Sequence, residues 1–289
     1  MNSPATTTRS LPASTLLQEL HAETLQRLGA EAGSLELERA VLGIFFTGVK
    51  LSGGPAGLCA TPVKSVPEAV CCPSSAKAMP VPGRIRGRKA VELLDDLYRP
   101  QDLRRAVAIA TLNALVELLW LRDGPPADAQ VSTGDAFDAL TMGPQDRVAL
   151  VGAFPPYMRA LRKRGQPFNV LELDPSTLKP DELPYYEPAE RAPQVIPQAD
   201  LLITTGTTLL NGSLDGLLRL LRPGAQAAVI GPTTPLLVRP YAGRGVTVIG
   251  GTRVLAGDEL LELLAEGGSG YHFFGKTVQR VTLHMPPAS

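Results

Sequence analysis

The sequence has few cysteines and no excess of charge of either sign. Its three cysteines, Cys59, Cys71 and Cys72, are an odd number with two of them adjacent, which argues against a disulfide framework and favours a reducing cytoplasm. Twenty-eight basic and 28 acidic residues leave a formal net charge of zero among 289 residues. Because nucleic-acid-binding proteins usually carry a basic patch, we expect no nucleic-acid partner.

Long hydrophobic runs are also missing. No segment approaches the ~20 consecutive apolar residues that a membrane-spanning helix needs, and residues 1–17 contain no unbroken apolar stretch of the kind found in signal peptides. We therefore expect a soluble, cytoplasmic protein with no membrane partner. A hydrophobic share of 44% beside 19% charged residues is typical of a globular chain, here long enough for one large domain or two ordinary ones.

The sequence lacks the spaced motifs of familiar catalytic and metal sites. It has no HExxH motif, no Walker loop, no nucleophile elbow and no usual zinc spacing, so no catalytic residue is assigned. Cys59 is expected to be a small buried thiol, although a soft cation could be held if it folds beside Cys71 and Cys72. His272 is the strongest histidine candidate, in a glycine-rich segment that could form a lid or supply a single ligand.

The first half of the chain predicts helices together with two strands. Apolar residues at helical spacing predict helices over 14–28, 89–98 and 102–121. Residues 37–51 predict a strand, followed by a turn at 53–55 and a second strand in GLCATPV. Asn113 is a polar residue on the apolar face of the longest helix, and we interpret it as an amide satisfied within the core.

The second half changes to strands that alternate with helices. Its apolar runs are RVALVGAF (147–154), FNVLELD (168–174), DLLITTG (200–206), AAVIGP (227–232), VTVIGG (246–251) and QRVTLHM (279–285). This alternation predicts an α/β fold with a parallel sheet of Rossmann type. We place a domain boundary near the end of the connector 124–143, giving domains 1–142 and 143–289.

In such a sheet ligands lie beyond the carboxyl ends of the strands, so the residues directly after each run are the candidates. Three runs are followed by turns rich in glycine and threonine, and one by two acidic residues. The candidate cofactor-binding residues are Glu172, Asp174, Thr205, Gly206, Thr207, Thr208, Asn211, Gly212, Ser213, Gly231, Pro232, Thr233, Thr234, Gly250, Gly251 and Thr252. Taken alone, 205–213 is equally consistent with helix capping by Asn211 or Ser213.

The turn after the first run disfavours ordinary NAD binding. VGAFPPY (151–157) lacks the GxGxxG spacing that brings a pyrophosphate against a helix start, and its two prolines stiffen the turn. Glu172 and Asp174 occupy the place where a dinucleotide site keeps an acid for the ribose hydroxyls. They could equally be metal oxygens or strand-end residues exposed to solvent.

Several of these segments together resemble a known family. TGTTLLNGSLD, GPTTPL, GGTRV and EGG, which lie between Val148 and the C-terminus, look like the putative heavy-metal-chelation domain family of bacteria and archaea. GLCATPV and AIATLNAL resemble the companion domain found in front of it. The resemblance implies a C-terminal Rossmann-like domain, an α+β N-terminal domain of enolase-N-terminal-like fold, and a ligand cleft between them. It also links the chain by name to metal chelation or metal-cofactor metabolism.

Three functions are compatible with these features. The first is binding or handling of a metal ion, a metal chelate or a metal-containing cofactor in the interdomain cleft. The second is an enzyme, a transferase or lyase, that acts on a small anionic or nucleotide-like ligand held by 205–213. The third is an accessory subunit of a metalloenzyme system, and either a homodimer or a metalloenzyme partner is compatible with the sequence.

Overall fold

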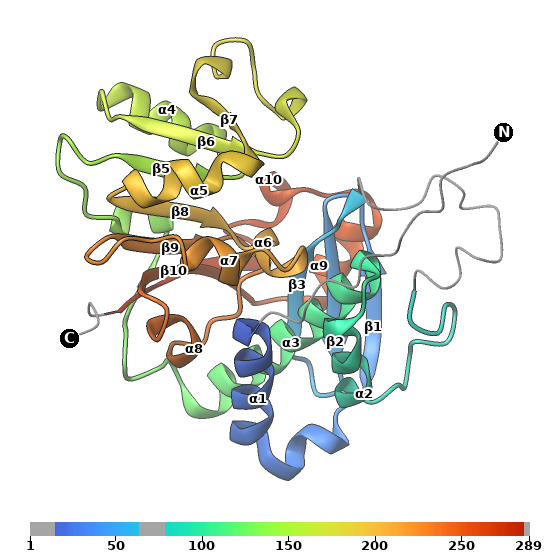
Figure 1. Cartoon of the computed structure of the whole chain (residues 1–289). Helices are drawn as coiled ribbons and strands as arrows, with labels where there is room; N and C mark the ends of the chain where they lie inside the picture. The colour runs from blue at the N-terminus through green and yellow to red at the C-terminus, as the bar shows by residue number, and fades with distance from the viewer. Residues whose placement is uncertain (1–14, 64–78, 286–289) are drawn as a thin grey trace, which may run out of the picture.

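The computed structural model describes residues 15–63 and 79–285, and Figure 1 shows an N-terminal and a C-terminal region packed against each other. The N-terminal region contains α1 (Thr15–Leu28), the 3-10 helix η1 (Gly29–Ser34), β1 (Leu37–Leu42), β2 (Phe46–Leu51) and β3 (Ala56–Ala60). The strands form an antiparallel sheet in the order β1-β2-β3. The single strand predicted over 37–51 is wrong, because the Gly43 N–H bonds to the Phe46 carbonyl and turns the chain into a hairpin.

Two helical stretches complete the N-terminal region. α2 (Ala90–Leu94) with the 3-10 helix η4 (Asp95–Tyr98), and the long α3 (Asp102–Asp123), confirm the helices predicted over 89–98 and 102–121. α3 packs against β3 so closely that a Cβ built on Gly57 would lie 2.3 Å from the backbone atoms Ala110 O and Ala114 N. The sheet therefore lies directly on the helix backbone at this point, where only glycine fits.

The C-terminal region is built on an eight-stranded sheet. Its strands are β4 (Gln130–Thr133), β5 (Val148–Val151), β6 (Phe168–Glu172), β7 (Tyr186–Pro188), β8 (Leu201–Thr205), β9 (Gln226–Ile230), β10 (Val246–Val254) and β11 (Val278–His284). They lie in the order β4-β11-β10-β9-β8-β5-β6-β7, and those from β10 to β7 run parallel. This is the doubly wound order 3-2-1-4-5-6 of Rossmann folds, so the predicted fold class is confirmed.

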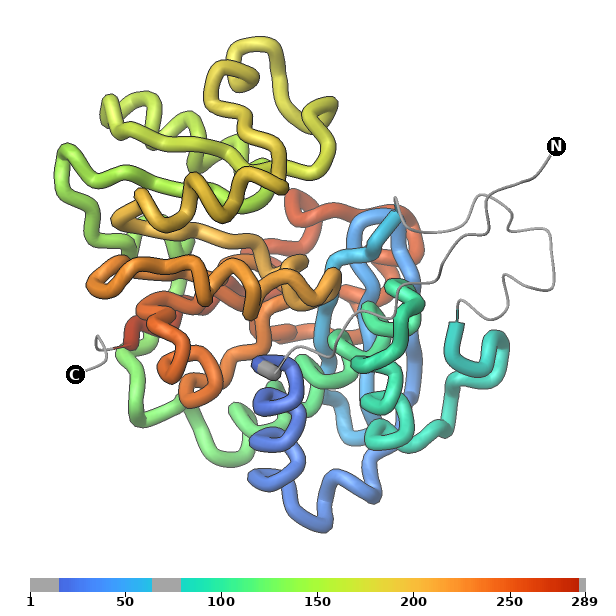
Figure 2. Tube along the Cα trace, in the orientation of Figure 1, coloured from blue at the N-terminus to red at the C-terminus, as the bar shows by residue number. Residues whose placement is uncertain are grey.

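Short helices connect these strands. They are η5 (Ala136–Ala139), α4 (Pro155–Lys163), η6 (Pro175–Thr177), η7 (Leu183–Tyr185), η8 (Ala189–Arg191), α5 (Ala192–Val195), η9 (Ile196–Gln198), α6 (Thr207–Leu210), α7 (Leu214–Leu218), α8 (Arg239–Ala242), α9 (Gly257–Ala265) and α10 (Gly270–Phe273). α4 packs on one face of the sheet, while α6, α7 and α8 pack on the other together with α1 and α3. Figure 2 shows α1, in blue, beside α8, in orange, far along the chain.

A membrane-spanning helix is not found among the residues that the structure describes. Among residues 15–63 and 79–285, no helix combines the length and the apolar composition that crossing a membrane requires. The longest helix, α3, carries charged residues at several of its positions and packs within the protein.

Two strands depart from the all-parallel sheet that the sequence predicts. β11 runs antiparallel to β10, and β4 runs antiparallel to β11. β4 is exposed along its whole length, so its residues lack the apolar run by which the other strands were recognised. It also precedes position 143 and yet pairs within the larger sheet. The domain division at 142/143 stays a prediction.

The two regions share a hydrophobic core. α9, from the C-terminal region, places the fully buried Leu260, Leu261 and Leu264 on the face of the three-stranded sheet opposite α3. The contact is close, because a Cβ on Gly48 would lie 2.6 Å from Leu261 Cδ2. Both faces of the small sheet are therefore covered, one of them by a helix that follows it by some 200 residues.

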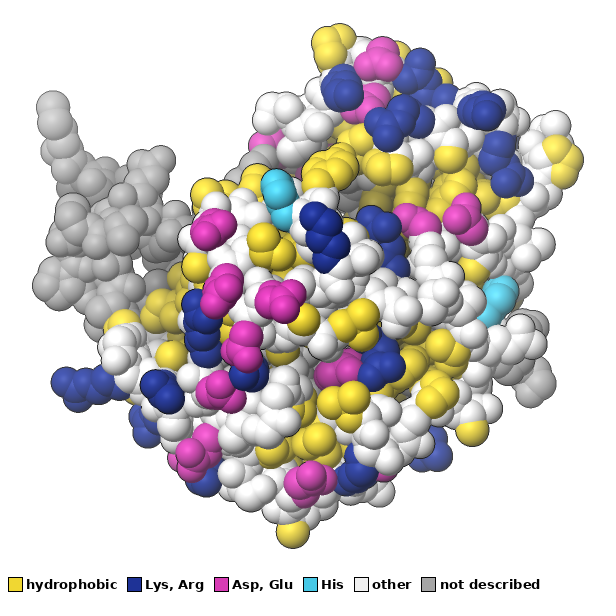
Figure 3. All heavy atoms as spheres, turned by 180° about the vertical axis from the view of Figure 1, so that it is seen from behind, with side chains coloured by type: hydrophobic (Ala, Val, Ile, Leu, Met, Phe, Trp, Pro, Cys, Tyr) yellow, Lys and Arg dark blue, Asp and Glu magenta, His cyan; other side chains and the backbone are white. Residues whose placement is uncertain are grey.

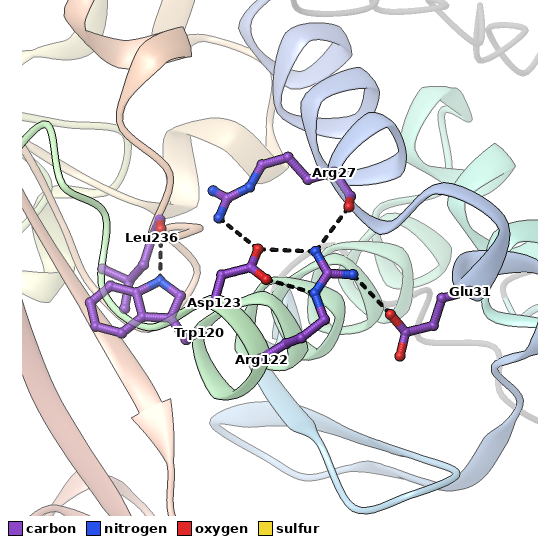
Figure 4. A network of polar contacts seen from close by, with 6 residues as sticks. All are labelled: Arg27, Glu31, Trp120, Arg122, Asp123 and Leu236. Atoms are coloured by element: carbon purple, nitrogen blue, oxygen red, sulfur yellow. Dashed lines mark hydrogen bonds and ion pairs between the residues drawn. The ribbon is translucent and has the colours of Figure 1, made fainter.

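An ion-pair network joins α1, η1 and the end of α3, as Figure 4 shows. Arg122 contacts Asp123 at 2.6 Å and Glu31 at 2.9 Å, and Arg27 contacts Asp123 at 3.2 Å. The hydrogen bond from Arg122, with a smaller contribution from Arg27, lowers the pKa of Asp123 from 3.8 to about 2. The ion pairs of Asp123 are therefore lost only in strong acid, where the carboxylate becomes protonated.

We expect Asp123→Asn to lower the melting temperature near neutral pH and to have a much smaller effect near pH 2. A carboxylate whose pKa is lowered by folding stabilises the folded state above its ordinary pKa, and this stabilisation is lost as the pH falls through the lowered value of about 2. Thermal unfolding of the parent and the variant across this range measures the difference. A difference that persists unchanged at pH 2 would contradict the ion-pair account.

Candidate functional site

The order of the parallel strands places a topological switch point between β5 and β8, where ligands of doubly wound sheets bind. A pocket of about 200 Å³, here called the switch-point pocket, opens at this position. Its polar lining residues are Glu172, Thr205, Thr207, Thr208, Asn211 and Ser213. Gly152 turns the chain beside it with a φ of 95°, and α4 then begins with Pro155 and Pro156, which have no N–H groups to offer a phosphate.

A larger cleft of about 530 Å³ lies between the N-terminal region and the loops after β6 and β8. It shares Leu173, Thr207 and Asn211 with the switch-point pocket, so the two cavities adjoin. The residues that line this inter-region cleft from the N-terminal side are Ile44, Phe45, Ala60, Thr61, Pro62, Val63 and Asp102. In Figure 1, α6 lies close to the end of β3 from which several of these residues come.

Residues 205–213 form the end of β8, the short helix α6 and the turn that precedes α7 (Leu214–Leu218), so the continuous loop predicted there is wrong. The Thr207 hydroxyl donates to Thr205 Oγ1 at 3.1 Å, and the buried Thr208 hydroxyl donates to the Thr205 carbonyl at 2.6 Å. Asn211 Oδ1 accepts from the Ser213 N–H at 3.0 Å and from its hydroxyl at 2.7 Å. Local hydrogen bonds order this segment, while Thr207 and Asn211 also line both cavities.

The turn 231–234 links the two regions. Thr233 and Thr234 are 1% and 2% exposed, and Thr233 Oγ1 accepts from the Ala60 N–H at 3.0 Å. Gly206 packs against this turn, since a Cβ on it would lie 2.4 Å from Thr234 Oγ1. The Asn113 amide donates to three carbonyls, those of Leu58, Pro232 and Thr233. The Asn113 side-chain N–H groups are thereby satisfied between the two regions, as predicted, although the residue is half-buried. Thr233 is held by its bond to Ala60, and Thr234 is buried against Gly206.

The prediction that Gly250, Gly251 and Thr252 follow a strand is wrong. β10 continues to Val254, because pairing with the antiparallel β11 extends it beyond its β-branched residues. A Cβ on Gly250 would lie 2.6 Å from Ala136 Cβ, so close packing alone requires this glycine. Together with Gly231 and Pro232, these residues line a third cavity, on the α4 side of the sheet.

Glu172 and Asp174 follow β6 as predicted, but both carboxylates bind backbone groups. Glu172 accepts from the N–H groups of Ala153 at 3.0 Å and Leu173 at 2.8 Å. Asp174 caps η6 by accepting from the Ser176 N–H at 2.9 Å. Glu172 therefore orders the turns after β5 and β6 while it lines the switch-point pocket.

A cluster of metal ligands is not found in the described part of the chain. Across residues 15–63 and 79–285, no three His, Cys, Asp or Glu side chains lie together as metal ligands would. His272 Nδ1 accepts from the Ser269 N–H at 3.0 Å in the capping box of α10. Cys71 and Cys72 lie outside the described residues. The cavities therefore offer hydroxyl, amide and carboxylate oxygens beside apolar surface.

Cys59 is expected to react with a thiol reagent only after unfolding. Burial raises the pKa of its thiol to about 12, against a smaller opposite effect of the hydrogen bond with Thr233, so the thiolate is scarce at neutral pH. The test is a DTNB assay on a chain carrying Cys71→Ser and Cys72→Ser, with the denatured chain as the positive control. Rapid, complete reaction of the native chain would contradict the buried state of Cys59.

The sequence interpretation did not identify the apolar residues of the inter-region cleft. Ile44, Phe45, Val63 and Leu173 are each more than half exposed, and all four line it. The signal was present as the run Ile44-Phe45-Phe46, but it was assigned to the middle of a strand. A hairpin at this position would have indicated that the first two side chains project from a turn.

Comparisons with known proteins agree on one family. Residues 135–283 match the family model described as "Putative heavy-metal chelation", and residues 25–116 match a second model with the same description. An uncharacterized protein of Methanocaldococcus jannaschii is 27% identical over 179 residues, which are 60% of this chain and 63% of that protein.

Two crystal structures of proteins with unknown function share the fold. The structure from Pyrococcus horikoshii has a TM-score of 0.74 and 18% identity, and the match covers 94% of this chain and 100% of that one. The structure from Desulfitobacterium hafniense has a TM-score of 0.67 and 17% identity, and the match covers 92% and 98%. At identities of 18% and 17%, these matches show that the two proteins and this chain share a fold that includes both regions.

Proposed function

Because this chain belongs to the family described as "Putative heavy-metal chelation", we propose that it binds a metal in the form of a preformed chelate, seated in the inter-region cleft. The family description supports a ligand that contains a metal. The lining of the cleft supports a ligand with an organic, partly apolar surface, and this lining is the observation that carries the proposal.

The cleft combines apolar contact surface with few polar side chains. Its volume of about 530 Å³ falls within the range typical of small-molecule sites. The exposed side chains of Ile44, Phe45, Val63 and Leu173 surround it, and such a grouping of apolar residues usually marks a binding surface. A chelate presents carbon atoms that these side chains can contact.

A bare heavy-metal ion fits the described lining less well. Such ions are usually held by three or four closely spaced side chains, often thiolates or imidazoles. The polar side chains lining the cleft in the described residues are Thr61, Asp102, Thr207 and Asn211, and the described residues contain no group of three His, Cys, Asp or Glu that could hold a metal. A chelate brings its own donors to the metal, so the protein needs only hydrogen bonds and apolar contacts.

Calorimetric titration of the full chain tests the proposal. The probes are nickel ion alone, nickel with citrate, nickel with 1,10-phenanthroline, and each chelator alone. We expect at least one nickel chelate to bind about 100 times more tightly than the free ion. Equal affinity for free nickel and for both chelates, or no binding of any chelate, would overturn the proposal.

Leu173→Ala should weaken binding of the chelate about tenfold. The leucine is 73% exposed in the cleft, and loss of its contact with a bound ligand is worth about 1.5 kcal/mol. Leu255→Ala is the matched control, because Leu255 is 59% exposed and is not among the lining residues of the cleft. The same calorimetric titration measures the chelate affinity of both variants. If Leu173→Ala and Leu255→Ala change this affinity equally, the chelate does not bind in the inter-region cleft.

A nucleotide-like ligand is a second candidate, favoured by Glu172. This residue ends the second strand of the doubly wound order, where dinucleotide sites keep an acid for ribose hydroxyls, and it lines the switch-point pocket. Titration with adenosine and AMP distinguishes the candidates, since Glu172→Gln should then weaken binding of the nucleoside more than binding of a nickel chelate. Absence of adenosine and AMP binding would remove this candidate.

A further inference from the structure

The third cavity, here called the rear pocket, lies on the α4 side of the eight-stranded sheet and has a volume of about 220 Å³. Its walls come from the turn after β4, the start of α4 and the segment between α10 and β11. Gly231, Gly250 and Gly251 supply backbone without side chains to its lining. Figure 3 shows the molecule from behind, with Lys and Arg side chains gathered over the upper part to which α4 belongs in Figure 1.

Aromatic rings form much of the wall of the rear pocket. Phe154 and Tyr157 stack with their centroids 5.0 Å apart and an interplanar angle of 4°, and Phe274 lines the pocket from the segment before β11. Tyr157 is 7% exposed, and its hydroxyl donates to Asp135 Oδ1, which fixes the ring. Flat, immobile rings beside bare backbone are suited to a planar ligand.

Arg280 places a cation at this pocket. Its guanidinium lies 4.0 Å from the centroid of the Phe274 ring, and no carboxylate of residues 15–63 and 79–285 forms an ion pair with it. Arg253, on the neighbouring strand, also lies over an aromatic ring but is paired with Glu117. An arginine held by stacking keeps its donors available for a carboxylate.

Asp135 is the carboxylate that lines the pocket, and its Oδ1 already accepts from the Tyr157 hydroxyl and the Phe137 N–H. Burial and this hydrogen bond raise the pKa of Tyr157, so the hydroxyl stays protonated and remains a hydrogen-bond donor to Asp135.

The volume of the rear pocket, about 220 Å³, limits the size of the ligand. A cavity of about 150 Å³ accepts benzene. The rear pocket therefore has room for one ring with a small substituent.

We propose that the rear pocket is a second ligand site, which binds a small planar aromatic carboxylate with its ring against Phe154, Tyr157 and Phe274 and its carboxylate on Arg280. This site is distinct from the inter-region cleft and does not depend on the chelate proposal. It assigns a ligand class to Arg280.

Titration of the full chain with three probes of similar size tests the site, by calorimetry and by chemical-shift changes of backbone amides. The probes are benzoate, its neutral analogue benzamide, and the non-planar cyclohexanecarboxylate. We expect benzoate to bind at millimolar concentration or below, about tenfold more tightly than either analogue. Absence of benzoate binding, or equal affinity for benzoate and cyclohexanecarboxylate, would overturn the proposal.

Substitutions locate the site. Arg280→Gln should weaken benzoate about tenfold and leave benzamide unchanged, and Phe274→Leu should weaken both. Arg159→Gln, which removes an exposed cation from α4, is the matched control, and Leu173→Ala in the cleft should also leave benzoate binding unchanged. Benzoate binding that is insensitive to Arg280→Gln, or that falls equally with Arg159→Gln, would refute the assignment.

Discussion

Replacement of Glu117 by alanine is expected to lower the free energy of unfolding by about 3 kcal/mol. Glu117 is 5% exposed in α3, and its carboxylate accepts from Arg253 Nε at 3.1 Å and from Nη2 at 2.6 Å. Without it, the Arg253 charge stays over the Trp120 ring, and no other carboxylate of residues 15–63 and 79–285 forms an ion pair with it. Removing one partner of a buried pair costs about 3–5 kcal/mol, and the 22% exposure of Arg253 favours the lower end.

Chemical denaturation of three variants separates this pair from an ordinary surface contact. Glu31→Ala breaks the exposed pair with Arg122 and should cost far less, because solvent screens this pair. Burial raises the pKa of Glu117 by more than Arg253 lowers it, so the pair does not fully offset its own desolvation. Glu117→Leu combined with Arg253→Met should therefore recover most of the loss. Equal costs for Glu117→Ala and Glu31→Ala would refute this account.

Gly57→Ala is expected to cost about 3 kcal/mol or more, although it adds a single methyl group. That methyl carbon would lie 2.3 Å from two backbone atoms of α3, Ala110 O and Ala114 N. Backbone atoms within a helix cannot rotate away, so β3 must shift from α3. Overpacking of a core usually costs about 1–3 kcal/mol and occasionally more, and a contact this short belongs at the upper end.

The matched control for this substitution is Gly33→Ala. A Cβ on Gly33 has no neighbour within 4 Å, and the change should alter stability by about 0.5 kcal/mol at most. Urea denaturation of both variants measures the difference. A shift of β3 should also weaken any ligand of the inter-region cleft, which the end of this strand lines. Similar stability of the two variants would show that β3 and α3 separate at little cost.

Local sequence patterns were sufficient to predict the main helices and strands of the fold. The apolar periodicity of α3 and the short β-branched runs of β5, β8 and β9 are signals within single segments, so the sequence predicts them directly. β4 is exposed and β7 has only three residues, so neither carries such a signal. The hairpin at Gly43 was missed for a similar reason, because the apolar run continues through the turn.

The candidate site was predicted only in part. The switch-point order does bring Glu172, Thr205 and Thr207 to one pocket. Thr233 has the same residue type and also follows a parallel strand, yet it faces Ala60 from the other region. Nothing adjacent in the sequence distinguishes these threonines, because the difference arises from contacts between residues far apart in the chain.

The segments 205–213 and 231–234, which follow β8 and β9, show what the sequence determined and what the tertiary structure decided. The sequence by itself determined the apolar runs and the helix-forming segments, which act through local sterics and burial. Only the tertiary structure decided which turns meet a cavity. The N-terminal sheet covers the 231–234 turn and leaves 207–211 beside the cleft, since packing of two hydrophobic regions follows their combined shape and not the pattern of either one.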